Sequence, residues 1–251
     1  MSDFNRNYAA ARTGYADRAA VDAGLRAYMI RVYNYMALAL AVTGVAAWGA
    51  FNMAVVDTGA GTLALTPFGQ AIYSLPGVIV MIAATLGLVF FISARIHTLQ
   101  PTTAMALLMV FSAVLGVSLS SIFVTYTGTS ITRVFFITAA SFGALSLYGY
   151  TTQRDLSPIG SFLMMGLIGL IIASVVNIFL KAPMLQFAIS AIGVLIFAGL
   201  TAYDTQRIKE MYDSLDDGTM VGRKAIMGAL QLYLDFINLF SFLLQFLGDR
   251  R

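Results

Sequence analysis

The segment LYLDFINLF, residues 232–240, is an apolar stretch of helix length with one carboxylate, Asp235, set into it. A second carboxylate, Asp204, lies near the end of the preceding apolar segment, within AYDTQ at residues 202–206. A charged side chain at bilayer depth is costly, so such residues usually face a protein interior, a partner or a water path. The two carboxylates are therefore the first candidate site in this chain.

The composition indicates a membrane protein. Of 251 residues, 59% are hydrophobic and only 11% are charged, whereas a soluble domain carries about a quarter charged residues. The absence of cysteine excludes disulfides, thiol catalysis and thiolate metal sites. A net charge of +3, spread along the chain, gives no reason to expect a nucleic-acid partner. Membrane lipid is the partner that the composition predicts.

Seven apolar runs follow one another at a steady spacing, and each is near the ~20 residues needed to cross the hydrocarbon. In lipid each must satisfy its own backbone polar groups, which predicts helices. The predicted class is an all-α membrane protein, with a soluble N-terminal tail at 1–26 and a single seven-helix transmembrane domain at 27–251. The tail lacks the apolar core and cleavage site of a removable signal peptide. The predicted spans are 28–51, 72–94, 103–125, 131–150, 159–180, 184–206 and 228–248.

The positions of Lys and Arg predict a cytoplasmic N-terminus. With that orientation 11 of the 15 basic residues fall on the inner side, which follows the positive-inside rule. The inner group is Arg6, Arg12, Arg18, Arg26, Arg31, Arg95, Arg154, Arg207, Lys209, Arg223 and Lys224; the outer group is Arg133, Lys181, Arg250 and Arg251. The sequence leaves two alternatives for the seventh span, which either crosses fully or re-enters and returns the C-terminus to the inner side.

The two carboxylates are predicted to meet. Asp204 lies near the inner end of the sixth span and Asp235 about two turns into the seventh, so adjacent antiparallel helices can place them at similar depth. Two carboxylates in low dielectric cannot both ionise cheaply, so one keeps a proton and donates it to the other. Such a pair can sense pH, and it can attract calcium weakly, since two carboxylates fall short of a full calcium cage. The alternative is that each Asp is hydrogen-bonded separately and has a purely structural role.

The seventh span carries a polar stripe. Gln231, Asp235, Asn238, Ser241 and Gln245 recur at steps of 4, 3, 3 and 4, which places them on one face of a helix. A helix facing lipid would not keep such a face, so we expect the seventh helix to be central. The stripe is compatible with a pore, but interhelical hydrogen bonding explains it equally well.

Arg95 ends the second span on the same side as the carboxylates. It can fold inward and neutralise the pair as a latch, or it can extend to the headgroups, as Arg at a helix end usually does. Arg31 is a weaker candidate for the latch.

The catalytic motifs that the chain lacks predict that it is not an enzyme. It has no Walker loop, dinucleotide turn, His-Glu-x-x-His motif or Gly-x-Ser-x-Gly elbow. An intramembrane aspartyl protease also uses two Asp residues, but its usual Gly-x-Gly-Asp context is absent around both carboxylates. We assign no catalytic residue and expect no cofactor.

The motifs AYDTQRIK at 202–209 and LYLDFINLF at 232–240 resemble the signature of the Bax inhibitor family, the transmembrane Bax-inhibitor-motif proteins, and the chain looks like a bacterial member. The resemblance covers nearly all of the chain after the tail. It implies a seven-helix fold with a central last helix and a pH-dependent calcium leak, with Asp204 and Asp235 as the di-aspartyl sensor and Arg95 as the best match to the latch. It also implies a multi-pass protein of the bacterial inner (plasma) membrane.

The favoured hypothesis is a pH-sensitive calcium (cation) leak channel gated by protonation of the pair, with calcium as the permeant ligand. The alternative is a membrane-embedded regulator that binds other membrane proteins without conducting ions. The family resemblance suggests a membrane-anchored AAA protease or stress and cell-death machinery as such partners. A transporter is a third reading.

Overall fold

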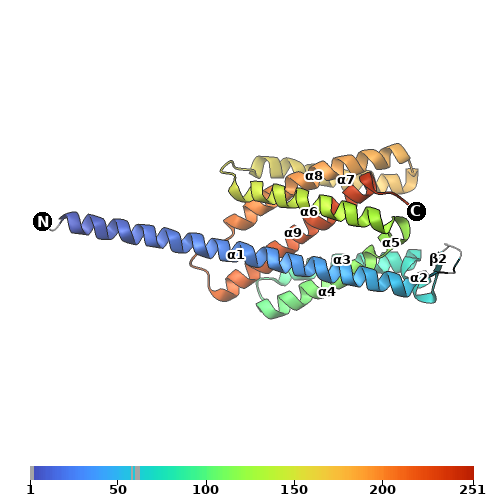
Figure 1. The fold of residues 1–251 in the computed structure, drawn as a ribbon, viewed down its shortest axis with the longest axis horizontal. Coiled ribbons are helices and arrows are strands. Elements are labelled where there is room, and N and C mark those ends of the chain that lie inside the picture. Colours follow the sequence, from blue (N-terminus) through green and yellow to red (C-terminus); the bar gives the residue numbers. More distant parts are fainter. Residues whose placement is uncertain (1–2, 58, 60–62) are drawn as a thin grey trace.

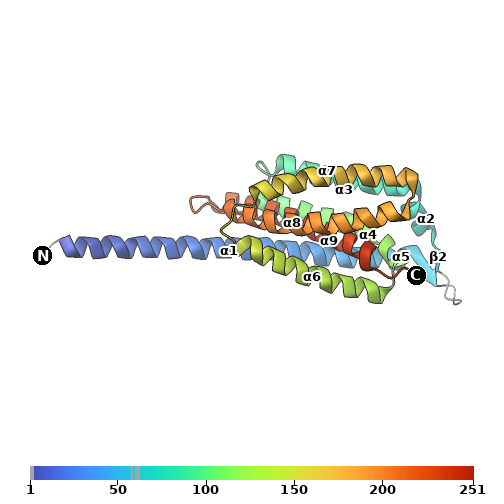
Figure 2. The same cartoon turned by 90° about the horizontal axis from the view of Figure 1, so that it is seen from above.

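The computed structural model describes the backbone of residues 3–57, 59 and 63–251, and the side chains of these residues except 3–20 and 57. Long helices run side by side along one axis, and α1 extends beyond the others at its N-terminal end (Figures 1 and 2). The elements are α1 (Asp3–Ala54), β1 (Val55–Asp57), β2 (Leu63–Leu65), α2 (Pro67–Tyr73), α3 (Leu75–Arg95), α4 (Pro101–Leu119), α5 (Ser121–Thr125), α6 (Gly128–Thr151), α7 (Ser157–Leu180), α8 (Pro183–Glu210) and α9 (Gly218–Leu247).

The all-α class and the seven spans are confirmed. In the described part of the chain, seven helical segments are long and apolar enough to cross a membrane, and they follow the predicted runs closely. The first begins at Val21 within α1, and the helix itself continues back to Asp3 through most of the region predicted as a tail. The solubility of the tail stays a prediction, and the side chains of Arg6, Arg12 and Arg18 lie outside the described residues.

The last helix is central, as predicted. Helix α9 packs against α1, α4, α6 and α8, and 56% of its most apolar stretch is buried, against 6% for α3. The peripheral helices have fewer neighbours. Helix α7 packs on α8, while α3 packs on α2 and α4, and both leave broad apolar faces exposed. This arrangement places the residues of α9 in the middle of the bundle.

Helix α9 begins ten residues before the predicted seventh span. The Asp217 side chain caps it by accepting from the Met220 N–H at 2.6 Å, and the Arg223 Nε donates to the Leu99 carbonyl at 2.7 Å. These polar contacts stabilise a first turn that hydropathy alone does not reveal. The helix then runs unbroken for 30 residues, and the C-terminus lies at the end of the bundle opposite the N-terminus (Figures 1 and 2). Helix α9 therefore runs along the bundle without turning back, and the side of the membrane on which the C-terminus lies stays a prediction.

Two local features differ from the predicted spans. The predicted third span, 103–125, is divided at Ser120, whose hydroxyl donates back to the Val117 carbonyl at 2.6 Å, so that α4 and α5 are separate helices. The stretch between the first two predicted spans contains an antiparallel pair of strands, with Val55 opposite Leu65, and the short helix α2. The side chain of Thr66 caps α2 by accepting from the Gly69 N–H at 3.1 Å.

Candidate functional site: a buried carboxylate pair in a membrane cavity

Asp204 and Asp235 come together from neighbouring helices. Asp204 lies on α8 and Asp235 on α9, and their side chains are within hydrogen-bond reach of one another. Both are buried, with exposed fractions of 7% and 5%. Helices α8 and α9 approach closely here, since a Cβ on Gly228 would come within 2.8 Å of the Ile208 side chain. The fold thus brings together the two carboxylates that the sequence analysis paired.

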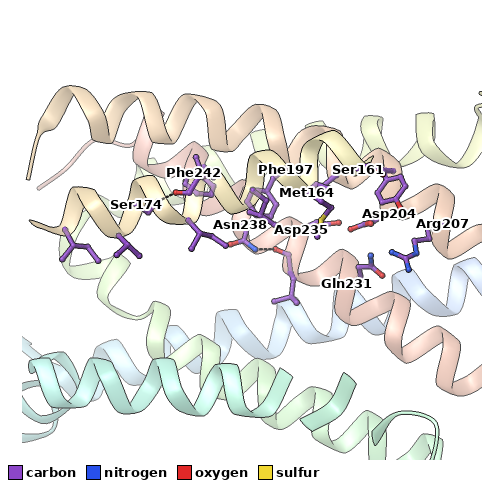
Figure 3. A pocket seen from close by; sticks show the side chains of 18 residues that line it. Ser161, Met164, Ser174, Phe197, Asp204, Arg207, Gln231, Asp235, Asn238 and Phe242 are labelled. Carbon is purple, nitrogen blue, oxygen red and sulfur yellow. Dashed lines mark hydrogen bonds between the residues drawn. The ribbon is translucent and has the colours of Figure 1, made fainter. Parts of the chain in front are cut away.

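The pair lines a cavity of about 680 Å³ between α7, α8 and α9. Figure 3 shows Asp204, Gln231 and Arg207 gathered toward one end of the cavity, with Ser174 toward the other. Most of the remaining wall is apolar, so the polar groups stand in a largely nonpolar surface. The lining residues are Ser161, Met164, Leu167, Leu170, Ile171, Ser174, Val175 and Ile178 of α7; Phe197, Leu200, Tyr203, Asp204 and Arg207 of α8; and Gln231, Leu234, Asp235, Asn238 and Phe242 of α9.

The carboxylates differ in their surroundings. The side chain of Gln231 is within hydrogen-bond reach of Asp204, and the Arg207 guanidinium acts on Asp204 electrostatically. The Oδ2 of Asp235 is buried without an N–H or O–H donor among the described residues. Two carboxylate oxygens can bond to each other only through a proton, so a single shared proton satisfies both groups. The geometry therefore suits a pair that holds one proton between two acids.

The polar stripe of α9 divides along its length. Gln231 and Asn238 line the cavity beside the pair. Asn238 also donates to the Leu234 carbonyl at 2.8 Å, and the Ser241 hydroxyl donates to the Ile237 carbonyl at 2.7 Å. Gln245 lies near the other end of the helix, where it accepts from Gln186 of α8 at 2.5 Å. Only part of the predicted stripe therefore belongs to the carboxylate cavity.

Arg95 is not beside the carboxylates in this structure. It is exposed at the end of α3, and its side chain has no hydrogen bond or ion pair with the described residues. The cation in the cavity is instead Arg207. The sequence contains a signal for this, because Arg207 follows Asp204 by three residues and so falls on the same helical face. The latch role of Arg95 stays a prediction.

The rest of the AYDTQRIK motif fixes the position of α8. The Thr205 hydroxyl is 2.9 Å from the Ser146 hydroxyl of α6. The side-chain amide of Gln206 joins α8 to the α6–α7 loop: its nitrogen donates to the Arg154 carbonyl at 2.8 Å, and its oxygen accepts from the Leu156 N–H at 2.9 Å.

A further contact joins α8 to the end of α6, where the Lys209 ammonium donates to the Tyr150 carbonyl at 2.9 Å. The motif thus combines one cavity acid with contacts that hold its helix in place.

The site offers few ligands for a tightly bound metal. Among the described residues, no group of three or more His, Asp or Glu side chains lies close enough together to hold a metal ion. The pair contributes at most four carboxylate oxygens, whereas calcium takes six to eight oxygen ligands. The nearby amides of Gln231 and Asn238 add oxygens of the right type. Any cation here would be weakly held and partly hydrated.

Comparison with known proteins gives the family. The family model described as inhibitor of apoptosis-promoting Bax1 matches residues 25–251. An uncharacterized protein of Caulobacter vibrioides is 47% identical over 100% of both chains. An uncharacterized protein of Rickettsia prowazekii is 49% identical over 92% of each chain. The inner membrane protein YbhL of Escherichia coli is 46% identical over 91% of this chain and 94% of its own. With seven apolar helices and a match over nearly its whole length, this chain belongs to the Bax inhibitor family of multi-pass membrane proteins.

Proposed function

We propose that this protein is a pH-sensitive leak channel for calcium or other cations, gated by protonation of Asp204 and Asp235. The observation that carries the proposal is the burial of both acids, within hydrogen-bond reach of each other, in the wall of a cavity of about 680 Å³. Charged groups placed inside membrane proteins usually mark ion paths or proton-linked sites. A buried acid pair without such a role would be a costly way to join two helices.

The gating step follows from the charge on the pair. With one shared proton, the two carboxylates hold α8 and α9 together through a hydrogen bond. When that proton leaves, two negative charges face each other in low dielectric and repel. The ionised pair also attracts a cation, with the Gln231 and Asn238 amides as further oxygen ligands. The titratable groups that line the cavity are Tyr203, Asp204, Arg207 and Asp235. Because a rise in pH removes the shared proton, cation flux should increase as pH rises.

We place the protein in the bacterial inner membrane with a cytoplasmic N-terminus. The inner-membrane relative YbhL and the seven apolar spans support the first part, and the distribution of Lys and Arg supports the second. In this orientation the end of α8 that carries Asp204 and Arg207 is the cytoplasmic end.

The test is calcium flux into liposomes that hold the full-length protein and an internal calcium dye, across a pH series. Wild type should leak in a pH-dependent way, and Asp204→Asn/Asp235→Asn should lose that dependence. Asp155→Asn is the matched control, since it also removes a carboxylate but lies outside the cavity. The Ser157 backbone N–H donates to Asp155 at 2.8 Å and lowers the pKa of that carboxyl. Equal flux in wild type and the double variant at every pH would refute the gated leak.

A regulator that binds other membrane proteins is the second candidate. Helix α1 extends beyond the rest of the bundle at its N-terminal end (Figure 1), and under this second proposal a partner such as a membrane-anchored protease binds there. In that case the pair is structural and the liposomes show no flux above protein-free vesicles. Flux that saturates or requires a co-ion would indicate a transporter instead.

A further inference from the structure

A second cavity, of about 490 Å³, lies at the end of the bundle where α7 turns into α8. It is formed by the end of α7, the turn, the first turns of α8, the end of α9 and the chain beyond it. The C-terminus lies at this same end (Figures 1 and 2). Ile178 lines both this cavity and the one that holds the carboxylates. The two spaces therefore adjoin along α7.

The charge of this second cavity is positive. Lys181 and Arg250 line it, and none of its lining residues is acidic. The ion pairs of the described residues, Arg133–Asp249 and Lys224–Asp216, leave both of these cations unpaired. The Arg250 guanidinium lies 6.0 Å from the centre of the Tyr126 ring, which orients it without neutralising it. A cavity of this kind favours an anion.

One side-chain hydrogen-bond donor at the cavity is also left free. The Asn177 side-chain amide donates to Gln186 Oε1 at 2.9 Å, and Gln186 Nε2 donates to the side-chain Oε1 of Gln245 at 2.5 Å. This series of hydrogen bonds ends at Gln245, whose side-chain amide nitrogen donates to no described residue. The N-terminus of the long helix α8 adds positive potential, since its cap residue Ala182 has no side chain that can bond to the first turn. The wall thus offers neutral donors next to the two cations.

Lys181 adopts a backbone conformation that normally belongs to glycine. It follows α7 with φ 50° and ψ 35°, and it is the one non-glycine residue with positive φ in the described part of the chain. A left-handed conformation is unfavourable for a residue with a side chain, which is why glycine usually ends a helix in this way. A lysine here keeps a cation at the cavity despite that cost, and such outliers often mark functional positions.

We propose that this second cavity binds an anionic membrane phospholipid, with the phosphate headgroup between Lys181 and Arg250. The chemistry of the site suits phosphate, for which cations and amide donors are the usual partners. A lipid, rather than free phosphate, is favoured because apolar side chains, among them Ile178 and Phe187, share the wall with the cations. The lipid's acyl chain lies along Ile178, beside the carboxylate cavity.

Native mass spectrometry of the full-length protein in detergent tests this, with phosphatidylglycerol or phosphatidylcholine titrated in. Wild type should retain phosphatidylglycerol more tightly than phosphatidylcholine. Lys181→Gly and Arg250→Gln should each weaken phosphatidylglycerol binding about fivefold, the usual effect of one cation at a lipid surface. Arg154→Gln removes an exposed cation outside this cavity and should bind as wild type does. Lys181→Gly relieves the backbone, so its melting temperature should not fall, and loss of lipid in that variant cannot be attributed to unfolding.

Two results would overturn the proposal. One is that wild type binds phosphatidylglycerol no more tightly than phosphatidylcholine, or that the double variant Lys181→Gly/Arg250→Gln keeps the same preference as wild type. The other concerns the source of the phosphate: glycerol phosphate or inorganic phosphate should not displace the lipid, because neither has an acyl chain. Displacement by either at the lipid's own concentration would assign the site to a soluble anion. None of these readouts depends on ion flux, so they hold whether or not the protein conducts.

Discussion

Arg207 lies one helical turn beyond Asp204 on α8, and both side chains line the carboxylate cavity (Figure 3). A cation beside an acid in general favours the charged form of that acid. A positive charge in the wall thus opposes the effect of burial, which favours the protonated pair. The balance between the two, together with the hydrogen bonds of the pair, contributes to the pH at which the proposed channel would open.

Replacing Arg207 by Gln should move the midpoint of the flux–pH curve to higher pH. Without the positive charge, the pair keeps its shared proton over a wider range, so a higher pH is needed to ionise it. The liposome assay measures the midpoint directly. Arg154→Gln removes a cation outside the cavity and should leave the curve in place. A midpoint that stays unchanged in Arg207→Gln would show that this cation does not act on the gate.

Gln206 should matter for stability, because it joins α8 to the α6–α7 loop. Gln206→Leu removes both of its bonds and leaves the Leu156 N–H and the Arg154 carbonyl without partners. The expected loss is about 1–3 kcal/mol, the usual cost of unsatisfied buried polar groups, seen as a lower melting temperature in detergent. Gln153→Leu, an exposed change in the same loop, is the matched control. Equal melting temperatures for the two variants would contradict the bridging role.

The crossing of α6 over α8 depends on Gly149. A Cβ built on Gly149 would come within 2.1 Å of the Ala202 carbonyl oxygen, and this backbone atom cannot move aside alone. Gly149→Ala should therefore force the helices apart and cost about 1–3 kcal/mol. Gly143 lies on the same helix with nothing within 4 Å of its Cβ position. Gly143→Ala should be neutral or stabilising by thermal melting, and a similar fall in both variants would indicate a loss of helix flexibility instead.

The sequence predicts the fold of this chain well because lipid simplifies the problem. Apolar runs of fixed length must be helices, and the polar face of the last run predicts that it is buried by its neighbours. The meeting of Asp204 with Asp235 follows from depth in adjacent helices. Contacts that depend on helix rotation or on loop geometry are harder to foresee. The early start of α9 rests on the cap by Asp217, which lies in a polar stretch where hydropathy gives no signal.

The arrangement around Arg95 illustrates the same limit. An arginine at the end of a span can point inward or outward, and sequence alone leaves both open. In the structure α3 packs only against α2 and α4 among its principal neighbours, which leaves Arg95 exposed and away from α8. Arg207 is closer to Asp204 in sequence and lies on the same helical face. It is also one of the 11 basic residues assigned to the inner side, and the positive-inside rule does not distinguish it from the others.

The shared proton itself can be tested through stability. If Asp204 and Asp235 hold one proton between them, raising the pH removes it and leaves two buried negative charges, so wild type should lose thermal stability as pH rises. Asp235→Asn keeps the shape of the side chain and supplies an N–H donor to Asp204, so its melting temperature should depend much less on pH. Asp204→Asn should behave in the same way, and the double variant should be destabilised by less than the sum of the two single changes, because the residues act as a pair. Thermal melts in detergent across a pH series measure all four proteins. If the two single changes lower the melting temperature additively, and all four proteins show the same pH dependence, the two acids are bonded independently. The pair then shares no proton.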